Sequence, residues 1–514
     1  MKKILYILSA VTVLSLASCK DYLDINHSPN SPDESQATAD MAFPAAEMAL
    51  SSKYGDVLRI IGGYLSEHYA HFFGTSNYVG YSQFKVAPNS TNSAYVDINR
   101  GAIANATVAR DKGEEEGVWG TYLAATVIRA FAFQTLVDAY GDAVYTEFGQ
   151  GLENLNPKYD DGPTVYAGLI EEIDYALSKV NENPAVATNL LFNGEGATNW
   201  IKLANALKLK LLMRERAVVN VDAQLTALVE EGNFPTKDVS WNKDNCFKEK
   251  ASGKGNPFWQ EEIFSGFGST QTNVGLNVAL SRAMLDYGDL RIFGFFLTNG
   301  DDDFWGSISG YNMSVSDKYK DDSFCQPALT YDTPVYLITL SEIDFFLSEY
   351  YRKVKNDSAK AKEYYEAAIK ASCETASYLY SLNNSKDEEG VKMIKESYDA
   401  ALNAWPYDGT DKSLGVQKWI ALSGTNNFEA WCEMRRLGYP AFGGKSAEQI
   451  YSFSADNLNA DNLTPGDLYT PYQVDAQIGA NALVQRFPYA QSSQLYNSNC
   501  PKVVPNSTKV FWAK

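Results

Sequence analysis

The sequence lacks the residue patterns that mark most metal, nucleotide and hydrolase sites. Its 514 residues include only three histidines and six cysteines, and no two cysteines are spaced as CxxC. HExxH, the P-loop, GxGxxG and GxSxG are also missing. We therefore expect no metal framework and no cofactor. Five cysteines are expected to be free thiols, with a chance disulfide as the alternative: Cys246, Cys325, Cys373, Cys432 and Cys500.

Apolar runs long enough to cross a membrane are also missing. The run Ile4–Leu16 is shorter than the roughly 20 residues that a membrane span needs. Two lysines precede it and Ala17–Ser18 follow, which is typical of a secretory signal. Cys19 comes next, as in bacterial lipoprotein signals, where the chain is cut before this cysteine and its thiol is acylated. A plain signal peptide that happens to contain a cysteine is the alternative.

These features predict a lipid-anchored protein that is exported. Residues 1–18 are predicted to be the signal peptide, and residues 19–34, rich in Asn, Ser and Pro, a short tether. Several acyl chains on one residue exceed what lasting membrane attachment requires. The rest of the chain, 35–514, is expected to fold outside the membrane.

Positive charge is in deficit. Lys and Arg number 44 against 63 Asp and Glu, for a net charge of −19. Removal of Lys2 and Lys3 with the signal leaves 42 positive against 63 negative residues, or −21. Such a surface repels phosphate backbones and anionic headgroups, which argues against nucleic-acid binding. The anchor, rather than electrostatic attraction, must hold the protein at the membrane.

Helical periodicity dominates two parts of the chain, about 118–218 and about 335–438. Consecutive amphipathic helices of similar length predict helix hairpins of the tetratricopeptide kind, and "KAKEYYEAAIKAS" has the small residues of such a unit. The predicted fold is mainly α, a tetratricopeptide-like helical-hairpin scaffold; an irregular helical bundle is the alternative. The expected helices are 118–140, 164–180, 199–218, 335–353, 358–379, 390–405 and 414–438.

Between these parts lies a long loop-rich insertion, about 219–334, and the tail after Gly438 is also loop-rich. The insertion is dense in Gly, Asn, Ser, Asp and Pro and contains three tryptophans. Long loops with aromatic residues are usually functional, so we expect the ligand platform here. Tyrosine offers an apolar face and a hydroxyl, which suits sites that bind polar ligands with flat apolar faces. The candidate ligand-binding residues are Trp259, Trp305, Tyr311, Asn312, Tyr78 and Tyr81. Residues of this kind are more often core residues or loop anchors, which is the alternative for each of them.

Other chemistry is supported only weakly. His68 and His71 stand one helical turn apart, but no third metal ligand follows at a recognisable spacing. The loop from Asp301 resembles a calcium loop at three positions, yet its twelfth position is Asn312 rather than Glu. The pair Glu261–Glu262 could in principle serve a glycosidase, although adjacent acids are commonest as solvated helix residues.

Several strings resemble the SusD/RagB family, and within it the SusD-like nutrient-binding lipoproteins. They are "DINHSPNSP" after the lipobox, "AFQTLVDAYGDAVYTE", "YGDLRIFGFF", "RFPYAQSSQLYN" and, most clearly, "NNFEAWCEMRRLGYP". The resemblance spans nearly the whole chain after the signal. Two patterns depart from it: Ser493 replaces an acid, and Asp289–Leu290–Arg291 stands where the family has Asp–Pro–Arg. These positions are expected to be structural.

The resemblance implies a surface-exposed lipoprotein of the outer membrane with a tetratricopeptide-like scaffold. Such a protein covers a SusC-like TonB-dependent barrel transporter, captures an oligosaccharide, a peptide or another oligomeric nutrient, and is not an enzyme. The residues alone leave two alternatives open. One is a surface glycoside hydrolase; the other is a structural lipoprotein whose helical repeats only dock other proteins.

Overall fold

The computed structural model describes residues 37–71, 77–250, 253–264, 273–300, 303–310, 325–450, 460 and 462–514. The predicted signal peptide and tether, Cys19, Tyr311 and Asn312 lie outside these ranges. The described chain is mostly helical with a few short strands, which confirms the predicted mainly α fold. Among the described residues, no helix is both long and apolar enough to span a membrane.

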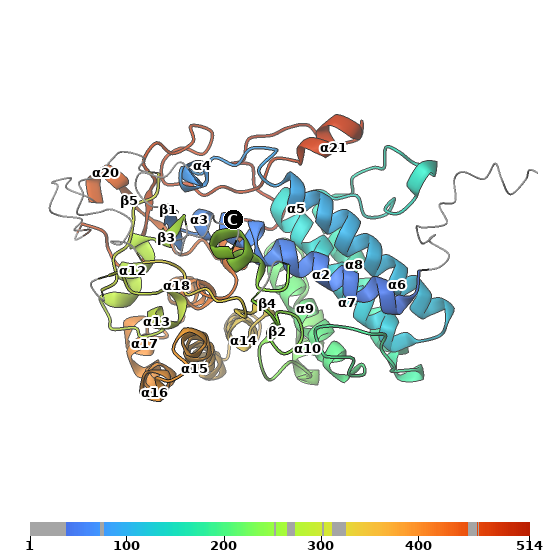
Figure 1. Ribbon diagram of the computed structural model, residues 1–514, viewed down its shortest axis with the longest axis horizontal. Helices are drawn as coiled ribbons and strands as arrows, with labels where there is room; N and C mark the ends of the chain where they lie inside the picture. The colour runs from blue at the N-terminus through green and yellow to red at the C-terminus, as the bar shows by residue number, and fades with distance from the viewer. Residues whose placement is uncertain are drawn as a thin grey trace, which may run out of the picture.

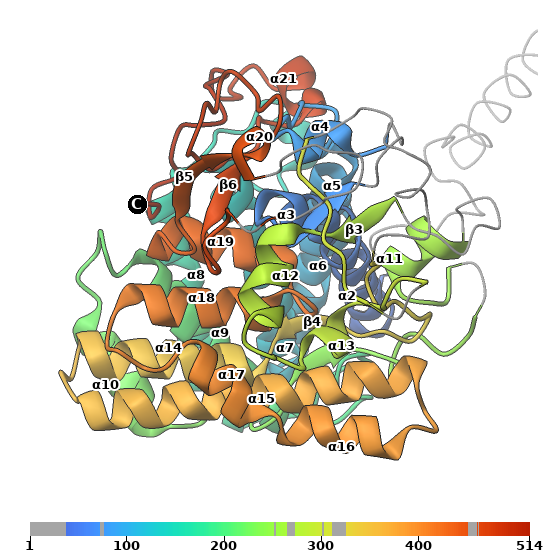
Figure 2. The ribbon, with the colours of Figure 1, turned by 90° about the vertical axis from the view of Figure 1, so that its left-hand side faces the viewer.

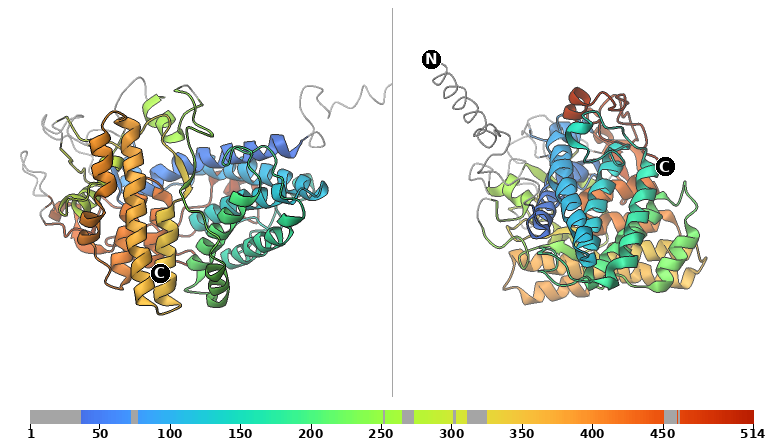
Figure 3. Two further views of the ribbon diagram at one scale, coloured as in Figure 1. Left: turned by 90° about the horizontal axis from the view of Figure 1, so that it is seen from below. Right: turned by 90° about the vertical axis from the view of Figure 1, so that its right-hand side faces the viewer.

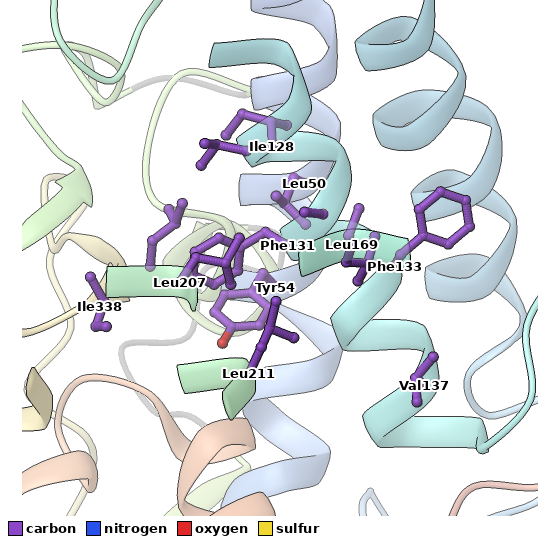
Figure 4. Packing of buried hydrophobic residues seen from close by; sticks show 14 of the residues in the cluster. Leu50, Tyr54, Ile128, Phe131, Phe133, Val137, Leu169, Leu207, Leu211 and Ile338 are labelled. Carbon is purple, nitrogen blue, oxygen red and sulfur yellow. The ribbon is translucent and has the colours of Figure 1, made fainter. Parts of the chain in front are cut away.

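The first helical group packs around one central helix, α7 (Trp119–Tyr140). All but its first residue are buried, because "VWGTYLAATVIRAFAFQTLVDAY" is apolar or small on every face. In Figure 4, Phe131 of α7 meets Leu207 and Leu211 of a neighbouring helix and Tyr54 of another. The helices around it are α2 (Ala39–Gly55), α6 (Ala104–Glu115), α8 (Gly162–Lys179) and α9 (Thr198–Glu215), and α10 (Asp222–Glu231) packs against α9.

The second group forms a layer of paired helices along the lower edge of the molecule in Figure 1 and runs side by side in the left view of Figure 3. The pair α14 and α15 is the most extensive, and Ser348 of α14 donates to the carbonyl of Ala361 at 2.7 Å. Its helices are α14 (Leu340–Lys353), α15 (Ser358–Asn383), α16 (Glu388–Glu396), α17 (Tyr398–Ala404), α18 (Asp411–Leu422) and α19 (Asn427–Leu437).

Three predicted helices differ from those observed. The segment predicted as helix 335–353 begins as strand β4 (Val335–Ile338), and helix 390–405 is divided into α16 and α17. Helix 414–438 breaks after Leu422. There Gly424 lies so close to the ring of Phe295 that a Cβ would overlap it, and the Asn426 side chain accepts from the Glu429 N–H and begins α19.

The strands of the described chain form small two-stranded sheets. β1 (Tyr69–His71) pairs antiparallel with β3 (Val274–Leu276), so that Ala70 lies opposite Gly275. β2 (Val239–Trp241) pairs antiparallel with β4, and β5 (Phe442–Ser446) pairs parallel with β6 (Leu468–Thr470). The β1–β3 pair joins the loop-rich insertion to the N-terminal helices.

Buried ion pairs join the two helical groups. Arg214 of α9 pairs with Asp138 of α7 and with Glu429 of α19, which belongs to the second group. Within the second group, Arg436 of α19 donates to both oxygens of Glu349 of α14 at 2.9 and 2.6 Å. Burial alone raises the pKa of Glu349, but the Arg436 charge outweighs it and lowers the pKa to about 2. The "FEAWCEMRRLGYP" string is therefore a structural element at the junction of the helical groups.

Candidate ligand-binding site

The candidate site lies where the β1–β3 pair joins α3 (Val57–Leu65) and α4 (Val79–Ser82) to the insertion. On the insertion side, α11 (Pro257–Trp259) continues into η5 (Gln260–Phe264). The Asn256 side chain starts α11 by accepting from the Trp259 N–H at 3.0 Å, and it donates to the Thr333 carbonyl at 2.8 Å. Figure 2 shows α3, α4 and β3 together in the upper part of the molecule.

Three tyrosines from the N-terminal side form an aromatic cluster at this site. The rings of Tyr78 and Tyr81 are nearly parallel, with centroids 5.8 Å apart and an interplanar angle of 18°. The buried ring of Tyr64 lies beneath them, 5.8 Å from Tyr78 and 6.2 Å from Tyr81. Both upper rings are half-buried, so each is supported from below and retains some exposed surface.

A carboxylate from the insertion holds this cluster in place. Glu262 of η5 accepts from the Tyr78 hydroxyl at 2.5 Å, and its other oxygen accepts from the Asn273 backbone N–H at 2.9 Å. Burial, and then the Glu262 charge, raises the pKa of Tyr78 well above its usual value, so the phenol stays protonated and donates. Tyr78 is thus fixed by a residue 184 positions away.

Beside the cluster is a hollow of about 220 Å³ between the end of α2 and the start of η5. Asp56, Lys254, Gln260 and Glu261 contribute polar groups to its lining. Burial, followed by repulsion from Glu261, raises the pKa of Asp56 to about 7. The charges of Glu261 and Asp56 also contribute to the raised pKa of Tyr78, which indicates that the hollow lies near the tyrosine cluster.

The two candidate tryptophans differ in their exposure. Trp259 is 4% exposed, with its ring edge-on to Tyr331 at 6.3 Å. Trp305 is half-buried and donates from Nε1 to Asp303 at 3.2 Å. Tyr311 and Asn312 are not among the described residues. The structure therefore brings Tyr78 and Tyr81 together and bonds Tyr78 to η5, shortly after Trp259 in the chain. Of the two tryptophans, only Trp305 is more than marginally exposed.

Two members of the site were not among the predicted ligand residues. Tyr64 lies within α3, and the density of tyrosines between residues 64 and 81 could have indicated it. Asp56 lies between α2 and α3, and no sequence signal marks it. Glu262 is one member of the carboxylate pair that could in principle serve a glycosidase. In the structure it is buried and bonded to Tyr78 and Asn273, whereas Glu261 is exposed.

The histidines serve packing. His68 is fully buried against the ring of Trp419, with centroids 5.0 Å apart, and His71 is also fully buried. The Asn427 side chain accepts from Arg59 and Tyr69, so its NH₂ group points to His68 Nδ1 at 2.9 Å. His68 is therefore the neutral tautomer that accepts at Nδ1. No cluster of three or more potential metal ligands occurs within the described ranges.

Among the described residues, every cysteine is a free thiol: Cys325, Cys373 and Cys432 are buried, Cys246 and Cys500 half-buried. A larger hollow, of about 590 Å³, lies between β2, β4 and α15. Its lining combines Lys237 and Lys243 with several carboxylates and includes none of the residues predicted from the sequence.

Comparison with known proteins assigns the chain to a family. The model of a SusD-like family, described as "Starch-binding associating with outer membrane", matches residues 46–456. The chain belongs to this family. A comparison with curated proteins finds no match.

Solved structures support the same fold. A SusD homologue from Bacteroides uniformis is 20% identical, with a TM-score of 0.69 over 91% of this chain and 98% of that one. A SusD/RagB family protein from Bacteroides thetaiotaomicron is 17% identical, with a TM-score of 0.67 over 93% and 99%. A chitin-binding protein is 19% identical, with a TM-score of 0.68 over 91% and 99%. At these identities the likeness establishes the SusD fold.

Proposed function

We propose that this SusD-like protein is a cell-surface lipoprotein that captures an oligosaccharide and delivers it to a SusC-like TonB-dependent transporter in the outer membrane. Family membership and the lipoprotein signal ending at Cys19 support the location and the partner. The observation that carries glycan capture is the parallel Tyr78–Tyr81 pair, supported by Tyr64 and held by Glu262 beside the hollow.

This arrangement suits a neutral sugar. The CH face of a sugar ring packs on the exposed part of a tyrosine ring, and its hydroxyls donate to carboxylates or amides in the hollow. Asp56, Glu261 and Glu262 make the site acidic, which disfavours uronic or sulfated glycans. Trp305 is proposed as a further stacking residue; Trp259, Tyr311 and Asn312 remain predicted contributors.

Isothermal titration with maltoheptaose and chitohexaose tests the proposal. Tyr78→Ala and Tyr81→Ala should each weaken binding by about 1–2 kcal/mol, roughly 5- to 30-fold, if stacking dominates. Tyr398→Ala is the matched control, because Tyr398 is 40% exposed on α17 in the opposite layer (Figure 1). Unchanged affinity in both tyrosine variants would place the site elsewhere.

Product analysis and partner capture separate the alternatives. Incubation with each oligosaccharide should leave it intact; release of shorter sugars would favour the hydrolase instead. Affinity purification of the lipidated protein from its own outer membrane should recover a barrel transporter. Failure to bind any oligosaccharide or peptide, together with recovery of a protein partner, would favour a purely structural docking role.

A further inference from the structure

A second cavity, of about 360 Å³, lies apart from the candidate site and shares none of its residues. Three distant stretches line it: the end of α5 (Asn92–Asp97) with the adjoining η2 (Ile98–Ile103), the loop 144–159, and α21 (Gln491–Tyr496). In Figure 1, α5 and α21 lie next to each other, away from α4. The volume is within the range of small-molecule sites, about 300–1,000 Å³.

Aromatic rings form much of the wall and are held rigidly from behind. The hydroxyls of Tyr95 and Tyr159 are hydrogen-bonded at 3.1 Å, and the Tyr159 ring packs edge-on against Tyr489 at 5.5 Å. Phe148 packs edge-on against the core residue Phe133 at 5.6 Å. At the rim, Tyr496 is 79% exposed. The cavity therefore combines fixed inner rings with an outer ring that is free to stack on a ligand.

Among the polar groups in the wall, Glu147 and Asn99 each offer an acceptor oxygen toward a ligand. Glu147 takes two hydrogen bonds at 2.8 Å on one oxygen, from the Lys158 backbone and the Asn154 side chain. These bonds lower its pKa, so it is ionised at neutral pH. Its second oxygen receives no hydrogen bond from the described residues. The Asn99 side chain donates to the Tyr95 carbonyl at 2.9 Å, which leaves its oxygen facing no described donor.

The lining also restricts the ligand class. The lining contains one carboxylate and no Lys, Arg or His, so no positive side chain in it balances the charge of an anionic ligand. Unused acceptors beside rigid rings match a neutral, hydroxyl-rich molecule whose hydroxyls donate and whose CH face stacks.

We propose that this cavity is a second saccharide-binding site, which takes a unit of a neutral oligosaccharide between Tyr496 and the rings of Tyr95, Phe148 and Tyr159. Glu147 and Asn99 accept hydrogen bonds from sugar hydroxyls there. The proposal rests on the proposed function only in the class of ligand, because the two sites are built from different residues. The protein then holds a glycan at two places.

Titration of the mature protein with maltoheptaose and chitohexaose tests this site. The wild type should bind the preferred probe at two sites. Glu147→Gln and Tyr496→Ala should weaken one class of sites about tenfold or more and leave the other unchanged. Glu153→Gln, at an exposed acid of the same loop outside the lining, is the matched control. Because Tyr496 is exposed, its loss should not affect folding, which thermal melting checks.

The outcomes distinguish this proposal from the proposed function. If Tyr78→Ala abolishes all binding while Glu147→Gln and Tyr496→Ala change nothing, the second site is refuted and the first stands. If only the Glu147 and Tyr496 variants lose binding, the second site stands and the site at Tyr78 and Tyr81 is refuted. Hydrogen exchange provides an independent measurement: the probe should protect peptides 144–159 and 491–497. Protection of these peptides by a purified barrel transporter but not by the saccharide would make the cavity a protein-docking surface and overturn the proposal.

Discussion

Replacing Trp259 with alanine tests whether this ring is a core residue, as its burial indicates, or a ligand platform, as its loop-rich sequence context predicts. Trp259 is 4% exposed within a core cluster that includes Phe258 and Leu276, and its backbone N–H is bonded to Asn256. Truncating a core tryptophan costs about 3–5 kcal/mol of unfolding free energy. Unfolding entropy of about 2.1 cal/mol/K per residue gives about 1 kcal/mol/K over 514 residues. The midpoint temperature of thermal unfolding of Trp259→Ala should therefore be about 3–5 °C below that of the wild type.

Trp305→Ala is the matched comparison. Trp305 is half-buried, so its loss should cost only about 1 kcal/mol of stability. If it stacks on a glycan, the same variant should weaken binding by about 1 kcal/mol or more. Thermal melting and titration of both variants measure the two effects separately. A Trp259→Ala protein that melts like the wild type but no longer binds glycan would refute the argument from burial and make the ring a ligand platform.

Three further predictions follow from charge and anchoring. Burial lowers the pKa of His68 from 6.5 to about 3, so as the pH falls the unfolded state binds this proton before the folded state does. The free energy of unfolding should therefore fall by up to about 1.4 kcal/mol per pH unit below pH 6.5. Chemical denaturation of His68→Gln should show a weaker dependence of this free energy on pH. Asp56 acts in the opposite direction, because its pKa of about 7 in the folded protein exceeds the ordinary value of 3.8. Its contribution to the free energy of unfolding should therefore decrease as the pH rises from about 4 to about 7. Chemical denaturation of Asp56→Asn at several pH values should lack this decrease. Cys19→Ala should release the protein from the membrane fraction and abolish palmitate labelling, and full retention with normal labelling would contradict the lipoprotein signal.

Helices with strong local patterns were predictable to within a few residues. α7 begins one residue after the predicted start and ends at the predicted Tyr140, because its sequence is apolar on all faces and Gly141 follows. The errors have non-local causes. Residues 335–338 are a strand because they pair with β2, almost a hundred positions earlier, and α18 ends where Gly424 contacts Phe295. No pattern within either segment encodes these neighbours.

The candidate site was only partly predictable for the same reason. Tyr78 and Tyr81 were predicted from their residue type and loop context, and the structure brings them together. Their supports, Tyr64 and Glu262, depend on the β1–β3 pair, which joins segments about 200 residues apart. The difference in burial between Trp259 and Trp305 likewise was not predictable from composition, since both occur in loop-rich stretches with several glycines and an acidic pair or triplet nearby.

The sequence by itself determined the net negative charge, the mainly helical fold and the family, and it predicts an export signal that ends before Cys19. Each of these depends on local chemistry: the length of an apolar run, a count of charges, or helical periodicity. Only the tertiary structure decided which aromatic rings are buried, which carboxylate holds Tyr78, and that α5, α21 and the loop 144–159 enclose a cavity. Exposure and hydrogen bonding depend on what packs against a residue, and in this fold those neighbours come from distant parts of the chain.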